Sequence, residues 1–245
     1  SVDPKTANPS GKFENITFNI PNPEVIQSFE TPLEHARQIN ADIILNSDPD
    51  ADRIGIMIKH NNKYEFLNGN EIGIVLTQYV IDKKKDKLAG QGVIVKTQVT
   101  SGLITKIAEQ NNMRCIGDLL VGFKFIGEVM NQLEREGKID NFLFGAEESH
   151  GFLAGNYVRD KDAVLPAIWL SELAAELKNQ KLTIIDYLRG IYSKYGYFRN
   201  YLTEIRLPGA EGMSQIKIIQ DTLKSNPPKL VGRFELDHVE DWMDR

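Results

Sequence analysis

The sequence predicts an α/β fold in which a mixed β-sheet is layered with helices. Between residues 70 and 145, apolar runs of strand length alternate with segments whose apolar residues recur every three or four positions. The connections between them are a few residues long, and this alternation is typical of βαβ units. Hydrophobic residues make up 41% of the chain and charged residues 26%, which is an ordinary globular composition.

The first 70 residues predict a loop, a helix and a β-hairpin. Residues 1–23 are rich in Pro, Asn, Ser and Gly, so we expect a loop or an edge segment there. Thr31, Pro32 and Glu34 predict a helix start of the capping-box type, and this helix should end near Asn40. Strands are expected at 42–46, 54–60 and 64–67, with a strand-like alternation at 16–20.

The rest of the chain predicts further strands and helices and then a separate tail. The expected strands are 93–99, 113–116 and 142–144, and the expected helices are 72–85, 102–108, 125–133, 163–178 and 183–195. Ser101 can cap the second of these helices. The tail from Tyr201 contains two Pro-rich breaks and predicts a small unit of its own, with a strand at 202–207, a helix at 215–223 and a strand at 232–236.

Composition and charge narrow the class of function. The formal net charge is -5 and the isoelectric point about 5.5, and no basic block indicates nucleic-acid binding. No run of 18 apolar residues exists, so we expect no membrane span. The single cysteine, Cys115, excludes an internal disulfide, fits the reducing cytoplasm and is predicted to be a buried structural thiol. The N-terminus has no signal-peptide form, and the missing first Met suggests a processed or truncated chain.

A run of alternating acids stands between two strands of buried type. In Ser47-Asp48-Pro49-Asp50-Ala51-Asp52-Arg53, an extended backbone would turn the three carboxylates toward one point. Their repulsion favours a bound cation, and hard carboxylate oxygens suit magnesium or calcium. An EF-hand is excluded because its sixth position would be Arg53 and its twelfth Lys59. The alternative is a solvated acidic turn.

A second polar loop follows the strand at 142–144. Glu147 and Ser149 stand two residues apart between glycines, and a carboxylate and a hydroxyl at this spacing can bind adjacent sugar hydroxyls. Its position at the end of a strand is typical of ligand loops. The alternative is a polar turn with a helix cap.

These two loops together resemble those of the α-D-phosphohexomutases, the phosphoglucomutase and phosphomannomutase enzymes. The resemblance implies that Asp48, Asp50 and Asp52 hold Mg²⁺, with a phosphoryl oxygen of a phosphoserine on another domain as a further ligand. It also implies that Glu147 and Ser149 in Gly145-Ala146-Glu147-Glu148-Ser149-His150-Gly151 hold the hydroxyls of the sugar.

Two further stretches resemble the same family. Gly122-Phe123-Lys124-Phe125 is similar to a loop that reads the sugar face, which would place Lys124 at the substrate; otherwise it is a solvated lysine at a helix start. Arg159-Asp160-Lys161-Asp162 is similar to the basic stretch near the reacting phosphoryl group. Lys161 would there stabilise charge or transfer a proton, while Asp162 can also cap the next helix.

Arg53 and His150 are the remaining residues in these motifs. Arg53 would contact the phosphoserine or support its loop, or simply neutralise the aspartates before it. His150 departs from the aromatic residue or glycine that the family pattern leads us to expect, and it is given no role.

The resemblance extends from about residue 21 to residue 244. It implies that 1–60 is the C-terminal part of a second domain with the metal loop, 61–200 a third domain with the sugar loop, and 201–245 the incomplete start of a fourth. The Thr/Ala-Ser-His-Asn-Pro loop with the phosphorylated serine and the Arg-x-Ser-Gly-Thr-type phosphate loop do not occur.

We therefore expect a fragment of a phosphoglucomutase-type enzyme. Such an enzyme interconverts glucose 1-phosphate and glucose 6-phosphate through a phosphoserine and a bisphosphorylated intermediate, and this chain alone should be inactive and bind Mg²⁺ weakly. The alternatives are a phosphomannomutase-type parent, a Mg²⁺-dependent sugar phosphatase of the haloacid-dehalogenase type with an aspartyl nucleophile, and a non-catalytic module that binds sugar phosphates or protein. The Glu-Glu-Ser form of the sugar loop favours glucose.

Overall fold

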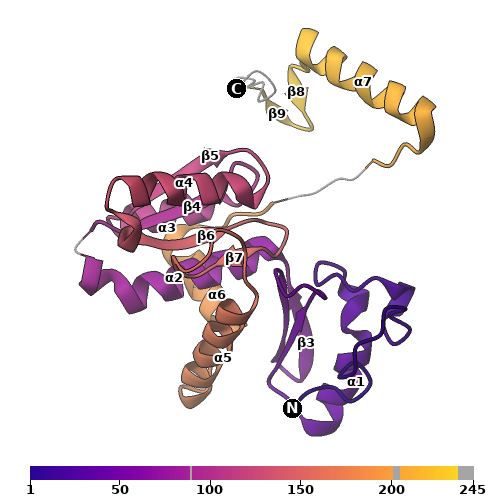
Figure 1. Ribbon diagram of the computed structural model, residues 1–245, viewed down its shortest axis with the longest axis vertical. Helices are drawn as coiled ribbons and strands as arrows, with labels where there is room; N and C mark the ends of the chain where they lie inside the picture. The colour runs from indigo at the N-terminus through magenta and orange to yellow at the C-terminus, as the bar shows by residue number, and fades with distance from the viewer. Residues whose placement is uncertain (89, 201–204, 237–245) are drawn as a thin grey trace. The chain divides into compact units, whose positions relative to one another are not determined.

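The computed structural model describes residues 1–88, 90–200 and 205–236, without the side chains of 85–88 (Figure 1). The chain forms two compact units, Ser1–Asn200 and Tyr201–Arg245. Within the described residues, no helix is both long enough and apolar enough to cross a bilayer.

An antiparallel three-stranded sheet opens the first unit. Its strands are β1 (Ile43–Ser47), β2 (Ile54–His60) and β3 (Lys63–Leu67), in the order β1-β2-β3. In β2, Ile54, Ile56 and Ile58 face the main core, while Met57 faces a small cluster beneath helix α1 (Glu30–Ile39). This period of two confirms the predicted hairpin, which is buried on both faces.

The N-terminal segment is the expected loop and not an edge strand: the strand-like alternation at 16–20 holds a 3₁₀ turn at Thr17–Asn19 (η1), which precedes a second one at Ile26–Phe29 (η2). The predicted capping box was wrong, since α1 begins at Glu30 and the Thr31 hydroxyl donates to the carbonyl of Asn15 at 2.7 Å. The predicted end of α1 is confirmed, with Asn40 in the left-handed conformation.

A mixed four-stranded sheet, in the order β5-β4-β6-β7, forms the centre of the first unit. Strand β4 pairs in parallel with β5 and β6, and β7 runs antiparallel to β6. The strands are β4 (Val93–Thr97), β5 (Arg114–Leu119), β6 (Phe142–Ala146) and β7 (Phe152–Leu153). The parallel strands end at one edge, where the loops after them gather.

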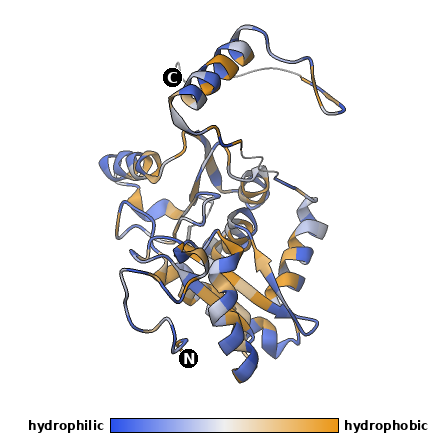
Figure 2. Ribbon diagram, turned by 90° about the vertical axis from the view of Figure 1, so that its right-hand side faces the viewer, coloured by the Kyte–Doolittle hydropathy of each residue, from blue (hydrophilic) through white to orange (hydrophobic). Residues whose placement is uncertain are grey.

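Helices cover both faces of this sheet, which confirms the predicted fold class. The central strand shows the alternation, since Ile94 packs in the main core and Val93 and Val95 pack under α4. Figure 2 shows the hydrophobic residues concentrated on the strands and the helix faces that meet them. The helices are α2 (Gly69–Leu88), α3 (Gly102–Gln110), α4 (Phe123–Arg135), η3 (Ile139–Asn141), α5 (Val164–Asn179) and α6 (Ile184–Tyr195).

The second unit contains α7 (Gly209–Ser225) and a short hairpin of β8 (Leu230–Val231) and β9 (Phe234–Glu235). The helix is longer than the predicted 215–223. Of the predicted strand at 232–236, Phe234–Glu235 forms the second strand of the hairpin, and Gly232 lies in its turn with φ 61°. Residues 202–204 of the other predicted strand lie outside the described residues, and 205–207 carry no strand.

Candidate functional site

The acidic loop joins β1 to β2. Asp48 is buried, Asp52 is half-buried and Asp50 is exposed, and one carboxylate oxygen from each lies within 4.8 Å of the others. Opposite oxygen ligands of Mg²⁺ stand about 4.2 Å apart, twice the metal–oxygen bond length. Neighbouring ligands stand only about 3.0 Å apart, so the three carboxylates would have to draw closer together to bind this ion, and their hard oxygen donors fit it.

The Asp48 side chain builds the loop as well as lining it. Its Oδ1 accepts hydrogen bonds from the backbone amides of Asp52 and Arg53, both at 3.1 Å. Ala51, which lies between Asp48 and Asp52, takes a positive φ of 56°. Its carbonyl accepts a hydrogen bond from the amide of Ala163 at 2.9 Å. The loop is thus fixed from within by one carboxylate and from outside by the start of α5.

Two cations meet the aspartates. Arg53 Nε lies 2.6 Å from Asp48 Oδ2, and its Nη1 lies 2.8 Å from Glu24 Oε1. Lys161 Nζ lies 2.6 Å from Asp52 Oδ2. Arg53 Nε also lies 3.7 Å from Asp52 Oδ1, so three ion pairs within the protein itself relieve the predicted repulsion among the aspartates.

The pKa directions follow from these contacts. Burial acts to raise the pKa of Asp48, but the hydrogen bonds from Arg53 outweigh it, so its pKa lies below the usual range. Burial raises the pKa of Asp52, and the neighbouring Asp48 adds to this while Lys161 opposes it. For Lys161, burial acts to lower the pKa, but the bond to Asp52 outweighs it and keeps the ammonium protonated.

The second polar loop connects β6 to β7. Glu147 is buried, its amide donates to the carbonyl of Gly151 at 2.8 Å, and its Oε1 accepts the amide of Gly122 at 2.8 Å. Burial raises the pKa of Glu147. Ser149 is half-buried, and its hydroxyl makes no hydrogen bond to any residue in the described part of the chain.

The two loops lie against each other. Arg53 and Gly151 form an isolated antiparallel bridge, and the amide of Ile54 donates to the carbonyl of His150 at 3.1 Å. A Cβ placed on Gly151 would lie 2.5 Å from Lys161 Cδ and 3.3 Å from Glu147 Oε2. The Lys161 side chain thus packs against Gly151, where only the absence of a Cβ leaves room for it to reach Asp52.

Lys124 is the predicted site residue that stands apart. It is exposed in the first turn of α4, with its Nζ 4.9 Å from the centroid of the Phe125 ring. Its link to the site is the amide of Gly122, which donates to Glu147. The capping role expected of Asp162 is confirmed, since its carboxylate accepts the amides of Val164 and Leu165.

Two buried polar residues were missed by sequence reasoning. His150 is 3% exposed, its Nδ1 lies 3.2 Å from the carbonyl oxygen of Ile54, and its ring stacks on Phe66. Burial lowers its pKa to about 4. Lys96 lies buried in β4, and its only sequence signal is a lysine directly after the apolar run Val93–Val95.

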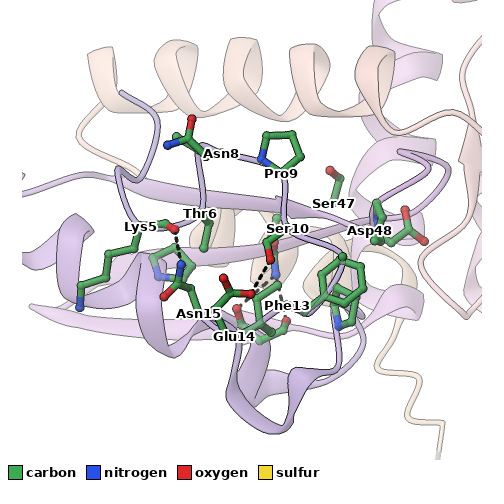
Figure 3. Close-up of a pocket in the computed structure, with 18 of the residues that line it drawn as sticks. Lys5, Thr6, Asn8, Pro9, Ser10, Phe13, Glu14, Asn15, Ser47 and Asp48 are labelled. Atoms are coloured by element: carbon green, nitrogen blue, oxygen red, sulfur yellow. Dashed lines mark hydrogen bonds between the residues drawn. The ribbon is translucent and has the colours of Figure 1, made fainter.

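A cavity of about 620 Å³ lies on the other side of the acidic loop (Figure 3). The N-terminal segment and β1 line it, with Ser47 and Asp48 among the lining residues. It includes neither Asp52 nor Glu147 nor Ser149, so it is separate from the space between the two polar loops.

The fold and these loops define a class: an α/β protein in which a carboxylate loop suited to a divalent cation faces a polar loop at the end of a parallel strand. Models for the phosphoglucomutase/phosphomannomutase family match twice, its α/β/α domain II at residues 1–62 and its α/β/α domain III at residues 68–195. The chain therefore belongs to the phosphoglucomutase/phosphomannomutase family.

Individual relatives agree. Phosphoglucomutases of Staphylococcus aureus strains N315 and USA300 are each 34% identical over 223 residues, which cover 91% of this chain but 39% of theirs. The chain thus spans about two fifths of the length of these relatives.

Two solved structures show the same fold. The open form of parafusin, a phosphoglucomutase from Paramecium, has a TM-score of 0.55 at 18% identity and covers 89% of this chain and 37% of that one. A phosphoglucomutase/phosphomannomutase family protein from Burkholderia thailandensis has a TM-score of 0.54 at 13% identity and covers 70% and 33%. The predicted domain boundaries at residues 60 and 200 stay predictions.

Proposed function

We propose that this chain supplies the metal loop and the sugar loop of a phosphoglucomutase-type enzyme. Such an enzyme interconverts glucose 1-phosphate and glucose 6-phosphate through a phosphoserine and a bisphosphorylated intermediate. The observation that carries the proposal is the convergence of three separate segments, in which Lys161 reaches Asp52 across Gly151 of the sugar loop. Membership of the family supports it.

Each residue in this proposal has a distinct task. Asp48, Asp50 and Asp52 would hold Mg²⁺, which when bound withdraws charge from a phosphoryl oxygen. Glu147 accepts hydrogen bonds from sugar hydroxyls and Ser149 donates one, which fixes the face of the sugar that is presented.

The cations act on the phosphoryl group. Lys161 stabilises the charge that develops on it, and Arg53 keeps Asp48 ionised and in place. Lys124 reaches the substrate from the start of α4. Phosphoryl transfer depends on positioning and electrostatics of this kind.

In such an enzyme the group that exchanges phosphate is a phosphorylated serine, and its Thr/Ala-Ser-His-Asn-Pro loop does not occur among these 245 residues. We accordingly propose that this chain alone shows no mutase turnover and binds Mg²⁺ weakly. Turnover of glucose 1-phosphate by the isolated chain at a normal rate would contradict this. Separately, we propose that the enzyme to which it contributes acts in the cytoplasm.

Binding of the sugar phosphate provides the direct test. Isothermal titration with glucose 1-phosphate in the presence of Mg²⁺ should show binding that Glu147→Gln and Ser149→Ala each weaken about tenfold, because each loses a direct hydrogen bond. Glu128→Gln on the exposed side of α4 is the matched control and should bind normally. Equal binding by all four proteins would refute the assigned roles, and stronger binding of mannose 1-phosphate would assign the phosphomannomutase alternative.

The environment of Asp48 favours this proposal over a phosphatase with an aspartyl nucleophile. Both oxygens of Asp48 are engaged, one by two backbone amides and the other by Arg53 at 2.6 Å. A carboxylate whose two oxygens are both held in this way has little freedom to turn and attack phosphorus. Phosphate release from glucose 1-phosphate that Asp48→Asn abolishes would reverse this preference. Sugar-phosphate binding without Mg²⁺, unchanged when the three aspartates are replaced, would instead assign the non-catalytic module.

A further inference from the structure

Lys96 is a charged residue buried in the central strand of the mixed sheet. It is 4% exposed, and its Nζ donates to the carbonyls of Thr97 at 3.1 Å, Thr100 at 3.0 Å and Gly117 at 3.4 Å. Gly117 makes room for it, since a Cβ there would lie 3.0 Å from Lys96 Cε. All three ammonium protons thus have backbone acceptors, at the end of β4, in the loop after it and on β5.

This burial is costly for the fold alone. In the described part of the chain, the hydrogen-bond partners of the Lys96 ammonium are all carbonyl oxygens. Burial lowers its pKa, and the charges of Glu148 and Asp118 oppose this without outweighing it. Removing an ammonium from water without a direct counter-ion costs free energy that an apolar residue of the same length would not cost. A functional role for the loop after β4, whose geometry Lys96 fixes, would account for this cost.

The loop after β4, which Lys96 holds, is hydrogen-bonded to the sugar loop. The hydroxyls of Thr97 and Thr100 lie 2.7 Å apart, and both donate to Glu148 Oε2, at 3.1 and 3.0 Å. On its other side, the backbone of Glu148 packs against Gly69, where an added Cβ would overlap its carbonyl oxygen. Glu148 is therefore fixed at both its side chain and its backbone.

Glu148 stands between Glu147 and Ser149 in the sequence. Because its side chain is drawn toward the loop after β4, the directions of the two neighbouring side chains are set by the same backbone. We propose that Lys96 is a positioning residue for the sugar-binding loop, which acts through Thr97, Thr100 and Glu148 to orient Glu147 and Ser149 toward a hexose phosphate. This inference rests on the proposed function, since it concerns the same loop.

The test compares Lys96→Met with a milder variant and a control. Lys96→Met removes the ammonium at nearly constant length and should weaken the binding of glucose 1-phosphate about tenfold or more. Thr100→Val removes one of the hydroxyls that hold Glu148 and should weaken binding about threefold to tenfold. Thr105→Val, whose hydroxyl lies 3.5 Å from Cys115 Sγ, removes a hydroxyl that has no link to Glu148 and should bind normally.

A second measurement separates positioning from general damage. In Thr100→Val, Mn²⁺ binding at the acidic loop should be unchanged and the melting temperature should fall by only about 2–4 °C, as the loss of one hydrogen bond predicts. The ¹⁵N amide resonances of Glu148 and Ser149 should shift. Loss of sugar-phosphate and Mn²⁺ binding in parallel with a lower melting temperature in both variants would overturn the inference in favour of a purely structural role. Unchanged sugar-phosphate binding in both variants would overturn the inference about Lys96 and leave the proposed function intact. No binding by the unmodified chain would overturn the proposed function and this inference together.

Discussion

Replacing Lys161 by Met should raise the affinity of the acidic loop for a divalent cation. Lys161 Nζ lies 2.6 Å from Asp52 Oδ2, and the two side chains are only 21% and 26% exposed. A metal ion that takes an oxygen of Asp52 must displace this ammonium or stand close to it. The lysine therefore acts as a tethered competitor for the site.

The size of the effect follows from the ion pair. Exposed pairs are worth up to about 1 kcal/mol, and two unit charges 4 Å apart near a protein surface attract by about 4 kcal/mol. A partly buried pair lies between these limits, so about 1–2 kcal/mol is returned to metal binding when the lysine is removed. This corresponds to an affinity that is about five- to thirtyfold higher.

Titration calorimetry with Mn²⁺ measures this directly, and no activity is needed. Lys178→Met is the matched control, because Lys178 pairs with Asp42 at a similar 2.7 Å, and Asp42 precedes β1 whereas the acidic loop follows it. The control should bind Mn²⁺ as the unmodified chain does. Equal or weaker binding by Lys161→Met would show that the ammonium does not compete with the metal and would refute the reasoning.

Three further predictions concern stability, and chemical denaturation measures each. Gly69→Ala should destabilise the first unit by about 3 kcal/mol or more, because its Cβ would overlap the backbone of Glu148, whereas Gly190→Ala, with open space around it, should be neutral or slightly stabilising. His150 takes up a proton near pH 6.5 when unfolded but only near about 4 when folded. Stability should therefore fall by about 3 kcal/mol as the pH drops from 7 to 4, beyond any change in His150→Asn. Thr183→Ala should cost about 1–2 kcal/mol, because it removes the capping box of α6.

Each of these has a contrary outcome. Similar unfolding midpoints for the two alanine variants would mean that the backbone beside Gly69 adjusts freely. Parallel pH profiles for the unmodified protein and His150→Asn would mean that this imidazole is not held neutral by burial. An unchanged midpoint in Thr183→Ala would show that the cap adds nothing to the packing of α6.

The acidic loop has a clear internal logic. Asp48 uses its carboxylate to shape the loop and to hold Arg53, while Asp52 is balanced by a lysine from a distant segment. The contacts that shape the loop therefore come from the protein itself. They offset the repulsion among the acids, but Lys161 would compete with a metal ion for Asp52.

Local patterns in the sequence determined most of the elements. The hairpin, the alternating strands and helices and the start of α6 at Thr183 follow from periodicity and capping, which depend on residues only a few positions apart. The two motifs at Asp48 and Glu147 were visible for the same reason, because their functional groups are close in sequence. The family resemblance rested on these motifs as well.

Only the tertiary structure decided the contacts between distant segments. The sequence predicted Thr31 as a helix cap, yet its hydroxyl donates to the carbonyl of Asn15. Residues 16–20 alternate like a strand but form a 3₁₀ turn instead. The pairing of Lys161 with Asp52 and the burial of Lys96 against three carbonyls are equally invisible to periodicity. Partners far apart in sequence meet only once the sheet is assembled, and the free energy of such contacts is set by burial and geometry that a linear pattern does not encode.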